Sequence, residues 1–255
     1  MSAAPADFWD TLPLGRGVES IVRDANGLAA FAKPAGVLSH PNETADQPRS
    51  LLTSRYDREG EYFEWNPPGG GTRRLWLLNR LDAATSGVIM TASSEALAKE
   101  IRALFQRKQV YKAYQALVFG QPSASKQVWR DRLAVLKKGG VVRADTGGNL
   151  PAEAAMTVLH QQRAAVPPLA LLRLEPKTGR SHQLRVQCAK RRLPIVGDGT
   201  YGDFPDNRAF AKRTGSKRLF LHSHETSFNY DFGGRSHAFK AIAPLPSEFA
   251  AALSG

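Results

Sequence analysis

The stretch LLNRLDAATSGVIM, residues 77–90, places a polar turn between two apolar runs. The runs at 75–78 and 88–90 predict two strands, and the turn between them carries Arg80 and Asp82. Catalytic groups are disproportionately found on loops that a rigid sheet positions, so Asp82 is a candidate nucleophile or acid/base group. A turn aspartate that hydrogen-bonds its own backbone is the alternative, and this stretch alone favours that alternative.

The composition of the chain favours a polyanionic partner. The 255 residues include 35 Lys and Arg against 23 Asp and Glu, a net charge of +12, and such an excess attracts nucleic acid or an anionic membrane. No apolar run approaches the roughly 18 residues that a spanning helix needs, and residues 1–14 lack the pattern of a signal peptide. Cys188 is the only cysteine, which excludes an internal disulfide and disfavours a cysteine-based zinc site. We therefore expect a cytoplasmic, polyanion-binding protein with no membrane partner.

The start of the chain predicts a hairpin followed by an irregular loop. Two apolar-rich segments, 18–23 and 28–33, flank the pair Asn26-Gly27, which is a strong hairpin signal. Pro34 comes next, and the residue before a proline is biased to extended geometry. Lys33 is therefore expected to project from the end of a strand.

The rest of the chain predicts many strands and few helices. Strands are expected at 110–119, 151–159, 169–174, 217–222 and 236–243, and helices at 94–105, 178–192 and 247–253. Residues 137–140 and 147–149 bracket a hairpin or a mobile excursion, and 203–217 is expected to be a loop. This balance indicates a single α+β domain with a largely antiparallel mixed sheet, flanked by helices and loops.

Two short segments resemble protein kinase signatures. They are NRLD at 79–82 and DFG at 231–233. A kinase needs an adjacent Arg-Asp pair, a glycine-rich loop upstream and the second motif a short way downstream, and the chain has none of these. A kinase is therefore excluded, and DFGG at 231–234 predicts a hairpin turn.

Four motifs resemble the RluA-type pseudouridine synthases and occur in that family's order. They are KPAG at 33–36, RLD at 80–82 with TSG at 85–87, KAYQA at 112–116, and TGRSHQLR at 178–185. PIVGD at 194–198 and YG at 201–202 follow, also as in the family. The resemblance implies the pseudouridine synthase fold over residues 18–255, with residues 1–17 as an N-terminal extension in place of the S4-type domain of some members.

The activity that the resemblance implies is isomerisation of particular uridines in structured RNA to pseudouridine. The substrate would be rRNA or tRNA, read as a stem-loop by a monomer that needs no protein partner. A redox-neutral rearrangement requires no cofactor or metal, and the sequence shows no cofactor motif. The rival interpretation is an inactive RNA-binding or RNA-folding protein with the same fold. It is disfavoured because simple RNA binding does not need a carboxylate that faces phosphates.

Three residues match the family's catalytic positions. Asp82 matches the essential aspartate, which could attack the sugar, attack the base or remove a sugar proton. Tyr114 matches a tyrosine that can stack on the base and assist loss of the carbon 5 proton, although a core tyrosine is the alternative. Arg180 matches the arginine that pairs with the aspartate, and a phosphate contact is compatible with that role.

The remaining candidates surround this set. Arg80 is expected either to help displace or replace the flipped nucleotide or to bind phosphate. The other candidates for supporting or RNA-contacting roles are Lys33, Lys112, His182, Gln183 and Arg185. Leu184 is a candidate for the apolar wall around the target base, with core packing as the alternative. His182 has no partner at metal-ligand spacing, so no metal site is expected. Asn79 stands where the family usually has His, which we interpret as a tolerated change in the support of the loop.

Overall fold

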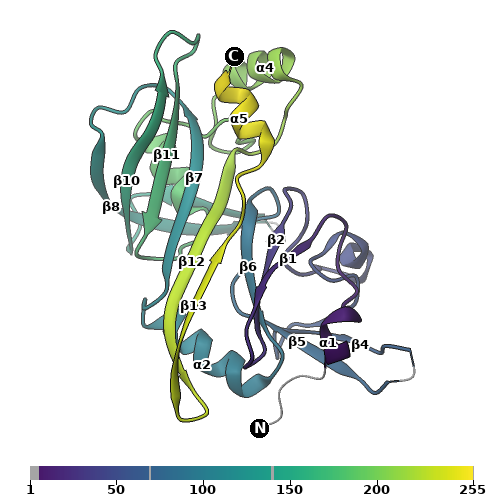
Figure 1. The fold of residues 1–255 in the computed structure, drawn as a ribbon. Helices are drawn as coiled ribbons and strands as arrows, with labels where there is room; N and C mark the ends of the chain where they lie inside the picture. The colour runs from purple at the N-terminus through teal and green to yellow at the C-terminus, as the bar shows by residue number, and fades with distance from the viewer. Residues whose placement is uncertain (1–5, 69, 139–140, 255) are drawn as a thin grey trace. The chain divides into compact units, whose positions relative to one another are not determined.

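The computed structural model describes residues 6–68, 70–138 and 141–254. Two compact units make up the chain (Figure 1): residues 1–110 with 225–243 form unit 1, and residues 111–224 with 244–255 form unit 2. Within the described residues, no helix is long and apolar enough to span a bilayer.

Unit 1 is built on antiparallel strands. In chain order its elements are α1 (Ala6–Asp10), β1 (Glu19–Arg23), β2 (Leu28–Lys33), the 3-10 helix η1 (Thr44–Arg49), β3 (Arg55–Asp57), β4 (Tyr62–Trp65), β5 (Arg73–Leu77), β6 (Ser86–Ala92), α2 (Glu95–Gln106) and β13 (Arg235–Ile242). The antiparallel pairs run in the order β3-β4-β5-β6-β2-β1. Strand β12 (Leu221–Phe232) begins in unit 2 and pairs with β13 through its unit 1 residues.

Strand β6 is the buried centre of unit 1, because all seven of its residues are buried. Val88 and Met90 belong to one apolar cluster, which also contains Leu97 and Ile101 of α2. Ile89, which points to the opposite face, belongs to a second cluster. Burial on both faces explains why the sequence after the Asp82 turn is a continuous apolar run rather than an alternating one.

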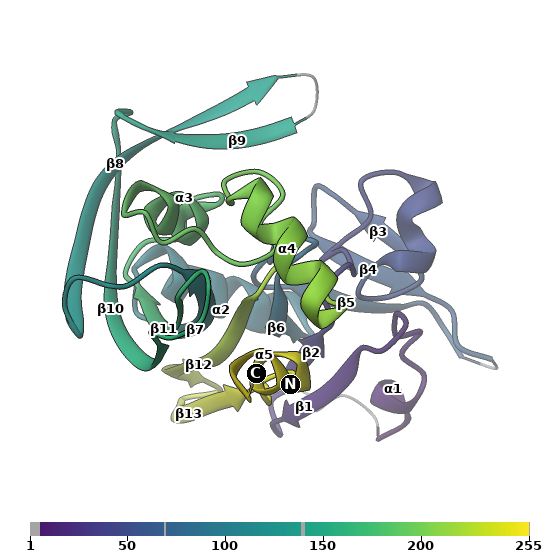
Figure 2. The ribbon, with the colours of Figure 1, turned by 90° about the horizontal axis from the view of Figure 1, so that it is seen from above.

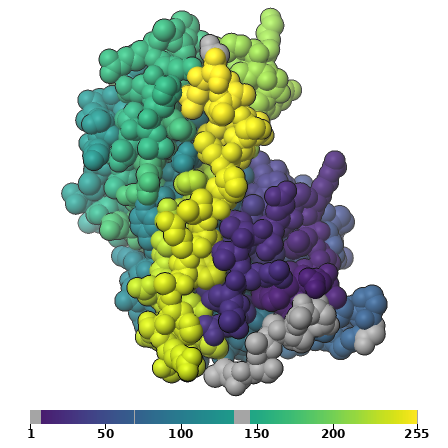
Figure 3. Space-filling view, viewed as in Figure 1, coloured from purple at the N-terminus to yellow at the C-terminus, as the bar shows by residue number. Residues whose placement is uncertain are grey.

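The hairpin and helix predicted in unit 1 are confirmed. Gly27, with φ 91°, closes the β1–β2 turn, where Oδ1 of Asp24 accepts hydrogen bonds from two backbone N–H groups. The side chain of Ser94 caps α2 by accepting from Leu97 N. Figure 3 shows the β1–β2 end of the chain (purple) against β12–β13 (yellow), where Tyr230 donates to the Asp24 carboxylate.

The N-terminal part of unit 1 packs onto its core. Phe8 of α1 is buried in the same cluster as Leu52, and an isolated bridge joins Leu14 to Leu52. Residues of the predicted extension at 1–17 therefore contribute to the unit 1 core.

Unit 2 is also built on antiparallel strands, and its described residues include three helices. Its elements are β7 (Tyr111–Phe119), β8 (Lys126–Lys138), β9 (Val141–Thr146), β10 (Leu150–Gln162), β11 (Leu169–Pro176), α3 (Gln183–Lys190), α4 (Phe204–Thr214) and α5 (Ser247–Ser254). The strand order is β7-β11-β10-β8-β9. Figure 2 shows α3 beside the β8–β9 hairpin. One apolar cluster joins the strands to all three helices through residues such as Cys188, Phe210 and Phe249.

The structure confirms the α+β class and corrects three predictions. The helix expected at 178–192 begins only at Gln183, because a tight turn precedes it. The loop expected at 203–217 is helix α4, whose N-cap Asp203 accepts from Asp206 N and whose C-cap Gly215 adopts φ 73°. The strand expected at 217–222 begins at Leu221 and continues to Phe232.

Several elements were confirmed and others were missed. The DFGG segment is a hairpin turn, in which Gly233 and Gly234 both have positive φ. The expected excursion after residue 137 is the β8–β9 hairpin, although Gly139 and Gly140 lie outside the described residues. Strands β3 and β4 and the helices α1 and η1 were not predicted.

Candidate active site

The Asp82 turn occupies residues 78–85, between β5 and β6 of unit 1. Asp82 is half-buried and Arg80 is exposed. The backbone N–H of Thr85 donates to the carbonyl of Asp82 at 2.9 Å, which closes the turn. The carboxylate therefore sits on a hydrogen-bonded turn that follows directly from the buried β5–β6 pair.

Asn79 anchors the start of this turn. Its Oδ1 accepts from Met90 N at 2.7 Å, and Leu78 N donates to Met90 O at 2.9 Å. The side-chain amide thus extends the β5–β6 pairing by one acceptor. This contact supports the interpretation of Asn79 as a change in loop support.

The side chain of Lys33 hydrogen-bonds to the backbone of the Asp82 turn. Only 1% of the residue is exposed, and its Nζ donates to the carbonyls of Pro34 at 3.0 Å, Val37 at 2.6 Å and Ala83 at 3.1 Å. The Ala83 carbonyl also accepts from Gly36 N at 2.8 Å. Of its two predicted roles, burial favours support of the Asp82 turn over contact with RNA.

Ser39 joins the same loop to the residue before Asp82. Its Oγ donates to Leu81 O at 2.8 Å and lies 2.9 Å from Leu81 N, which donates to it. Together with Lys33, this contact ties the backbone on both sides of Asp82 to the 33–39 loop. Ser39 was not predicted, since a lone serine in a loop carries no signal of its own.

His40 and Tyr56 form an aromatic pair that was also missed. The ring of His40 stacks on that of Tyr56 at 4.7 Å between centroids. Burial, with the charge of Glu61, raises the pKa of Tyr56 to about 12, and the positive charge of Arg80 opposes this rise. The guanidinium is thus near enough to the phenol to act on it electrostatically.

In unit 2, the amide of Gln183 organises the turn that carries Arg180. Its Oε1 accepts from Thr178 Oγ1 at 2.7 Å and from Arg180 N at 3.2 Å, while its Nε2 donates to Glu153 O at 3.1 Å. The half-buried Arg180 side chain reaches Pro151 O, with 3.4 Å from Nε. Gln183 is itself 4% exposed, so of its predicted roles burial favours support of the turn over contact with RNA.

Arg185 forms a buried ion pair. Its Nε and Nη2 each donate to the carboxylate of Asp198 at 2.8 Å, and its guanidinium lies 5.1 Å from the ring centroid of Tyr201. Burial alone would raise the pKa of Asp198, but hydrogen bonds from Arg185 and from the backbone of Tyr201 and Thr200 bring this pKa below its ordinary value. Of its two predicted roles, this pairing favours support over RNA contact.

His182 and Leu184 flank the start of α3. His182 adopts a left-handed backbone conformation with φ 53°, and its Nδ1 lies 2.9 Å from the hydroxyl of Tyr201. Leu184 is 6% exposed and belongs to the unit 2 core, which supports the core-packing alternative for that residue.

Lys112 and Tyr114 lie on the same side of β7, because strand residues two apart share a face. Tyr114 is half-buried and packs against the unit 2 core. Burial lowers the pKa of Lys112. A Cβ placed on Gly179 would lie 3.7 Å from Nζ of Lys112, so this ammonium lies beside the turn that holds Arg180.

The predicted site residues fall into two groups. Unit 1 brings Lys33 and Arg80 to the Asp82 turn, and unit 2 gathers Lys112 at the Arg180 turn. The pairing of Asp82 with Arg180 joins residues of different units and stays a prediction. No group of three or more His, Cys, Asp or Glu side chains among the described residues is arranged to hold a metal ion.

The sequence matches the profile of a protein family described as RNA pseudouridylate synthase over residues 27–190, more than half of the chain. The chain belongs to this family. The match contains all four motifs on which the resemblance rests. The predicted family and reaction class are therefore confirmed, while the roles of individual residues stay predictions.

Relatives of this RNA pseudouridylate synthase differ in how much of their length it covers. It is 31% identical over 228 residues to tRNA pseudouridine synthase C of Vibrio cholerae, covering 83% of this chain and 86% of the relative. It is 32% identical over 183 residues to ribosomal large subunit pseudouridine synthase C of Vibrio parahaemolyticus, covering 72% of this chain and 56% of the relative. The solved structure of human RNA Pseudouridylate Synthase Domain Containing 1 matches with a TM-score of 0.68 at 24% identity, over 92% of this chain and 87% of that one. This likeness confirms the predicted fold.

Proposed function

We propose that this protein isomerises uridine to pseudouridine in tRNA. The observation that carries the choice of RNA is coverage, since the chain spans 86% of a relative named for tRNA but 56% of a relative named for the large ribosomal subunit. Ribosomal RNA is the second candidate, because the ribosomal relative is 32% identical over 72% of the chain. We expect a cytoplasmic monomer that acts on a stem-loop.

The reaction is redox-neutral. The bond from the ribose to the uracil nitrogen breaks, the base rotates, and a bond forms from the same sugar carbon to carbon 5. Carbon 5 loses a proton and the freed nitrogen gains one, so atoms and electrons balance without a co-reactant. The protein has to hold the base, supply a carboxylate and move one proton.

Asp82 is the proposed essential carboxylate. Its turn is tied by Lys33, Ser39 and Asn79 to the surrounding backbone, and a carboxylate carried on a turn with a fixed backbone suits catalysis better than one on a mobile turn. Tyr114 stacks on the base and assists loss of the carbon 5 proton. Arg180 pairs with Asp82 through its planar fork, and Arg80 takes the place of the flipped nucleotide.

Release of tritium from 5-labelled uridine tests this proposal. Wild-type protein in chelator-treated reactions should release tritium from unmodified tRNA. The isosteric variant Asp82→Asn should release none, yet should bind tRNA at least as tightly, since it removes a negative charge from a phosphate-binding surface. Release from rRNA alone would select the second candidate. Tight binding with no release from either RNA pool would select the inactive rival, and full activity of Asp82→Asn would overturn the role of Asp82.

A further inference from the structure

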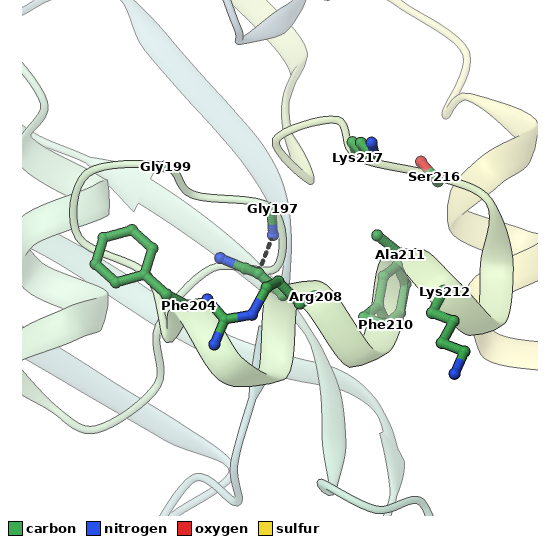
Figure 4. Close-up of a pocket in the computed structure, with 10 residues that line it drawn as sticks. Gly197, Gly199, Phe204, Arg208, Phe210, Ala211, Lys212, Ser216 and Lys217 are labelled. Carbon is green, nitrogen blue, oxygen red and sulfur yellow. Dashed lines mark hydrogen bonds between the residues drawn. The ribbon is translucent and has the colours of Figure 1, made fainter.

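A cavity of about 580 Å³ lies beside α4 in unit 2, and none of the described residues that line it belongs to the turn of Arg180. Figure 4 shows α4 along one side of the cavity, with the segments around Gly197 and Lys217 opposite. Asn207 joins the helix to the first of these segments, because its Oδ1 accepts from Gly197 N at 2.6 Å and its Nδ2 donates to Asp198 O at 3.1 Å. The cavity is thus built on the same loop that holds Arg185.

The close packing of this wall makes its shape definite. Gly197 has φ 75°, and a Cβ on it would lie 1.7 Å from Arg218 O, so no other residue fits without moving the backbone. Helix α4 is in turn capped at both ends, by the side chain of Asp203 and by Gly215. The backbone of α4 that carries the side chains lining the cavity is therefore held in one position.

Three of these side chains form a stripe on α4. Phe204, Arg208 and Lys212 are spaced four residues apart, so they lie on neighbouring turns of one face. Phe204 is 51% exposed, and Figure 4 shows the Arg208 guanidinium extending toward it. Lys217 adds a third cation across the cavity.

The cations on this surface are available to a ligand. Arg208, Lys212 and Lys217 are exposed, and in the part of the chain that the structure describes none of them forms a salt bridge. An exposed aromatic ring beside unpaired cations suits a nucleic acid strand, whose bases stack on rings and whose phosphates meet cations. The +12 net charge points to the same class of partner.

We propose that this surface, named here the α4 surface (Phe204, Arg208, Lys212 and Lys217), binds an unpaired segment of the RNA substrate outside the target nucleotide. One base stacks on Phe204, and the adjoining phosphates contact the three cations. This inference rests on the proposed function, since it assigns a second contact for the same RNA. The α4 surface would then add affinity and choice of RNA without taking part in the chemistry.

Two variants test the α4 surface. Phe204→Ala should raise the Kd for unmodified tRNA about 5- to 140-fold, the equivalent of about 1–3 kcal/mol for one stacked base. Phe204→Tyr, which keeps the stacking face, should bind like wild type. The triple variant Arg208→Ala, Lys212→Ala, Lys217→Ala should lower the slope of log Kd against log salt for polyuridylate by about 2, at about 0.7 for each phosphate on a single strand. The rate of a single turnover at saturating tRNA should not change in any of them.

Lys99→Ala, on the exposed face of α2 in unit 1, is the matched control and should leave the Kd unchanged. Wild-type Kd and salt slope in both the Phe204→Ala and triple variants would overturn the proposal, and an effect of the triple variant alone would overturn the stacked base. Binding and turnover are measured separately. Loss of affinity in these variants with no tritium release from wild type would refute the proposed function and leave the α4 surface standing.

Discussion

The side chain of Asn79 accepts a hydrogen bond from the backbone of Met90, with 2.7 Å between Oδ1 and N. This contact closes the β5–β6 pair at the point where the chain leaves it for Asp82. An asparagine therefore does in this chain what a neutral histidine ring nitrogen can also do, which is to accept one hydrogen bond. The departure from the family's usual residue leaves the support of the turn intact.

Asn79→Ala should destabilise the protein and slow turnover. Met90 N–H is then left without an acceptor at a largely buried position, which lowers the free energy of unfolding by about 1–3 kcal/mol. Urea unfolding with a single-turnover assay measures both effects. Asn79→Asp keeps the acceptor oxygen and is the control. Equal stability of Asn79→Ala and wild type would show that the contact is dispensable.

Lys33→Met should impair the Asp82 turn while leaving RNA affinity close to wild type. The substitution keeps most of the side-chain volume but removes the donor for three carbonyls, and unsatisfied buried acceptors cost about 1–3 kcal/mol. We expect a lower unfolding midpoint and a slower single turnover. If affinity falls as steeply as the rate, Lys33 contacts RNA instead.

Breaking the Arg185–Asp198 pair should give a pH-dependent loss of stability. Asp198→Asn leaves a buried guanidinium without its charge partner, a change that typically costs about 3–5 kcal/mol near neutral pH. Since the pKa of Asp198 is below its ordinary value of 3.8, the unfolded chain binds more protons below that pH. The stability contributed by the carboxylate is therefore complete above 3.8 and is lost as the pH falls through the lowered pKa.

Urea unfolding of wild type and Asp198→Asn at several pH values checks this prediction. The difference between the two proteins should stay constant above pH 3.8 and shrink below it. Adding Arg185→Met should restore part of the stability lost in Asp198→Asn, because it removes the unpaired charge. A difference that does not vary with pH would mean that Asp198 acts only through packing.

Lys112→Met should weaken RNA binding without lowering the free energy of unfolding. Burial lowers the pKa of Lys112, so the charged form is disfavoured in the folded protein, and wild-type stability should rise with pH between the lowered pKa and 10.5. Removing the ammonium should therefore leave stability equal or higher at neutral pH and should weaken tRNA binding. Lys177→Met, an exposed lysine of the same unit, is the control, with a change in stability of at most about 0.5 kcal/mol. A large loss of stability in Lys112→Met would point to a structural role.

Sequence alone determined the features whose signals lie within a few residues of one another. The β1–β2 turn follows from Asn26-Gly27, and α2 follows from its serine cap and apolar face. The family follows from four motifs in order, and the Asp82 turn from two apolar runs that flank it. Helix α4 was within reach too, since an N-cap aspartate and a glycine past its end mark it locally, but its polar composition suggested a loop.

Only the tertiary structure decided what the charged residues of the motifs do. Lys33 and Arg185 look alike in sequence, as basic residues in motifs of an RNA-modifying family. The buried Lys33 donates to a backbone carbonyl 50 residues away, and the buried Arg185 pairs with a carboxylate 13 residues away. An unpaired charge buried away from water costs more free energy than local secondary-structure propensity can offset. A buried cation therefore needs a partner, and where that partner lies distant in the chain only the tertiary structure shows whether the cation is paired inside the protein or is left to contact RNA.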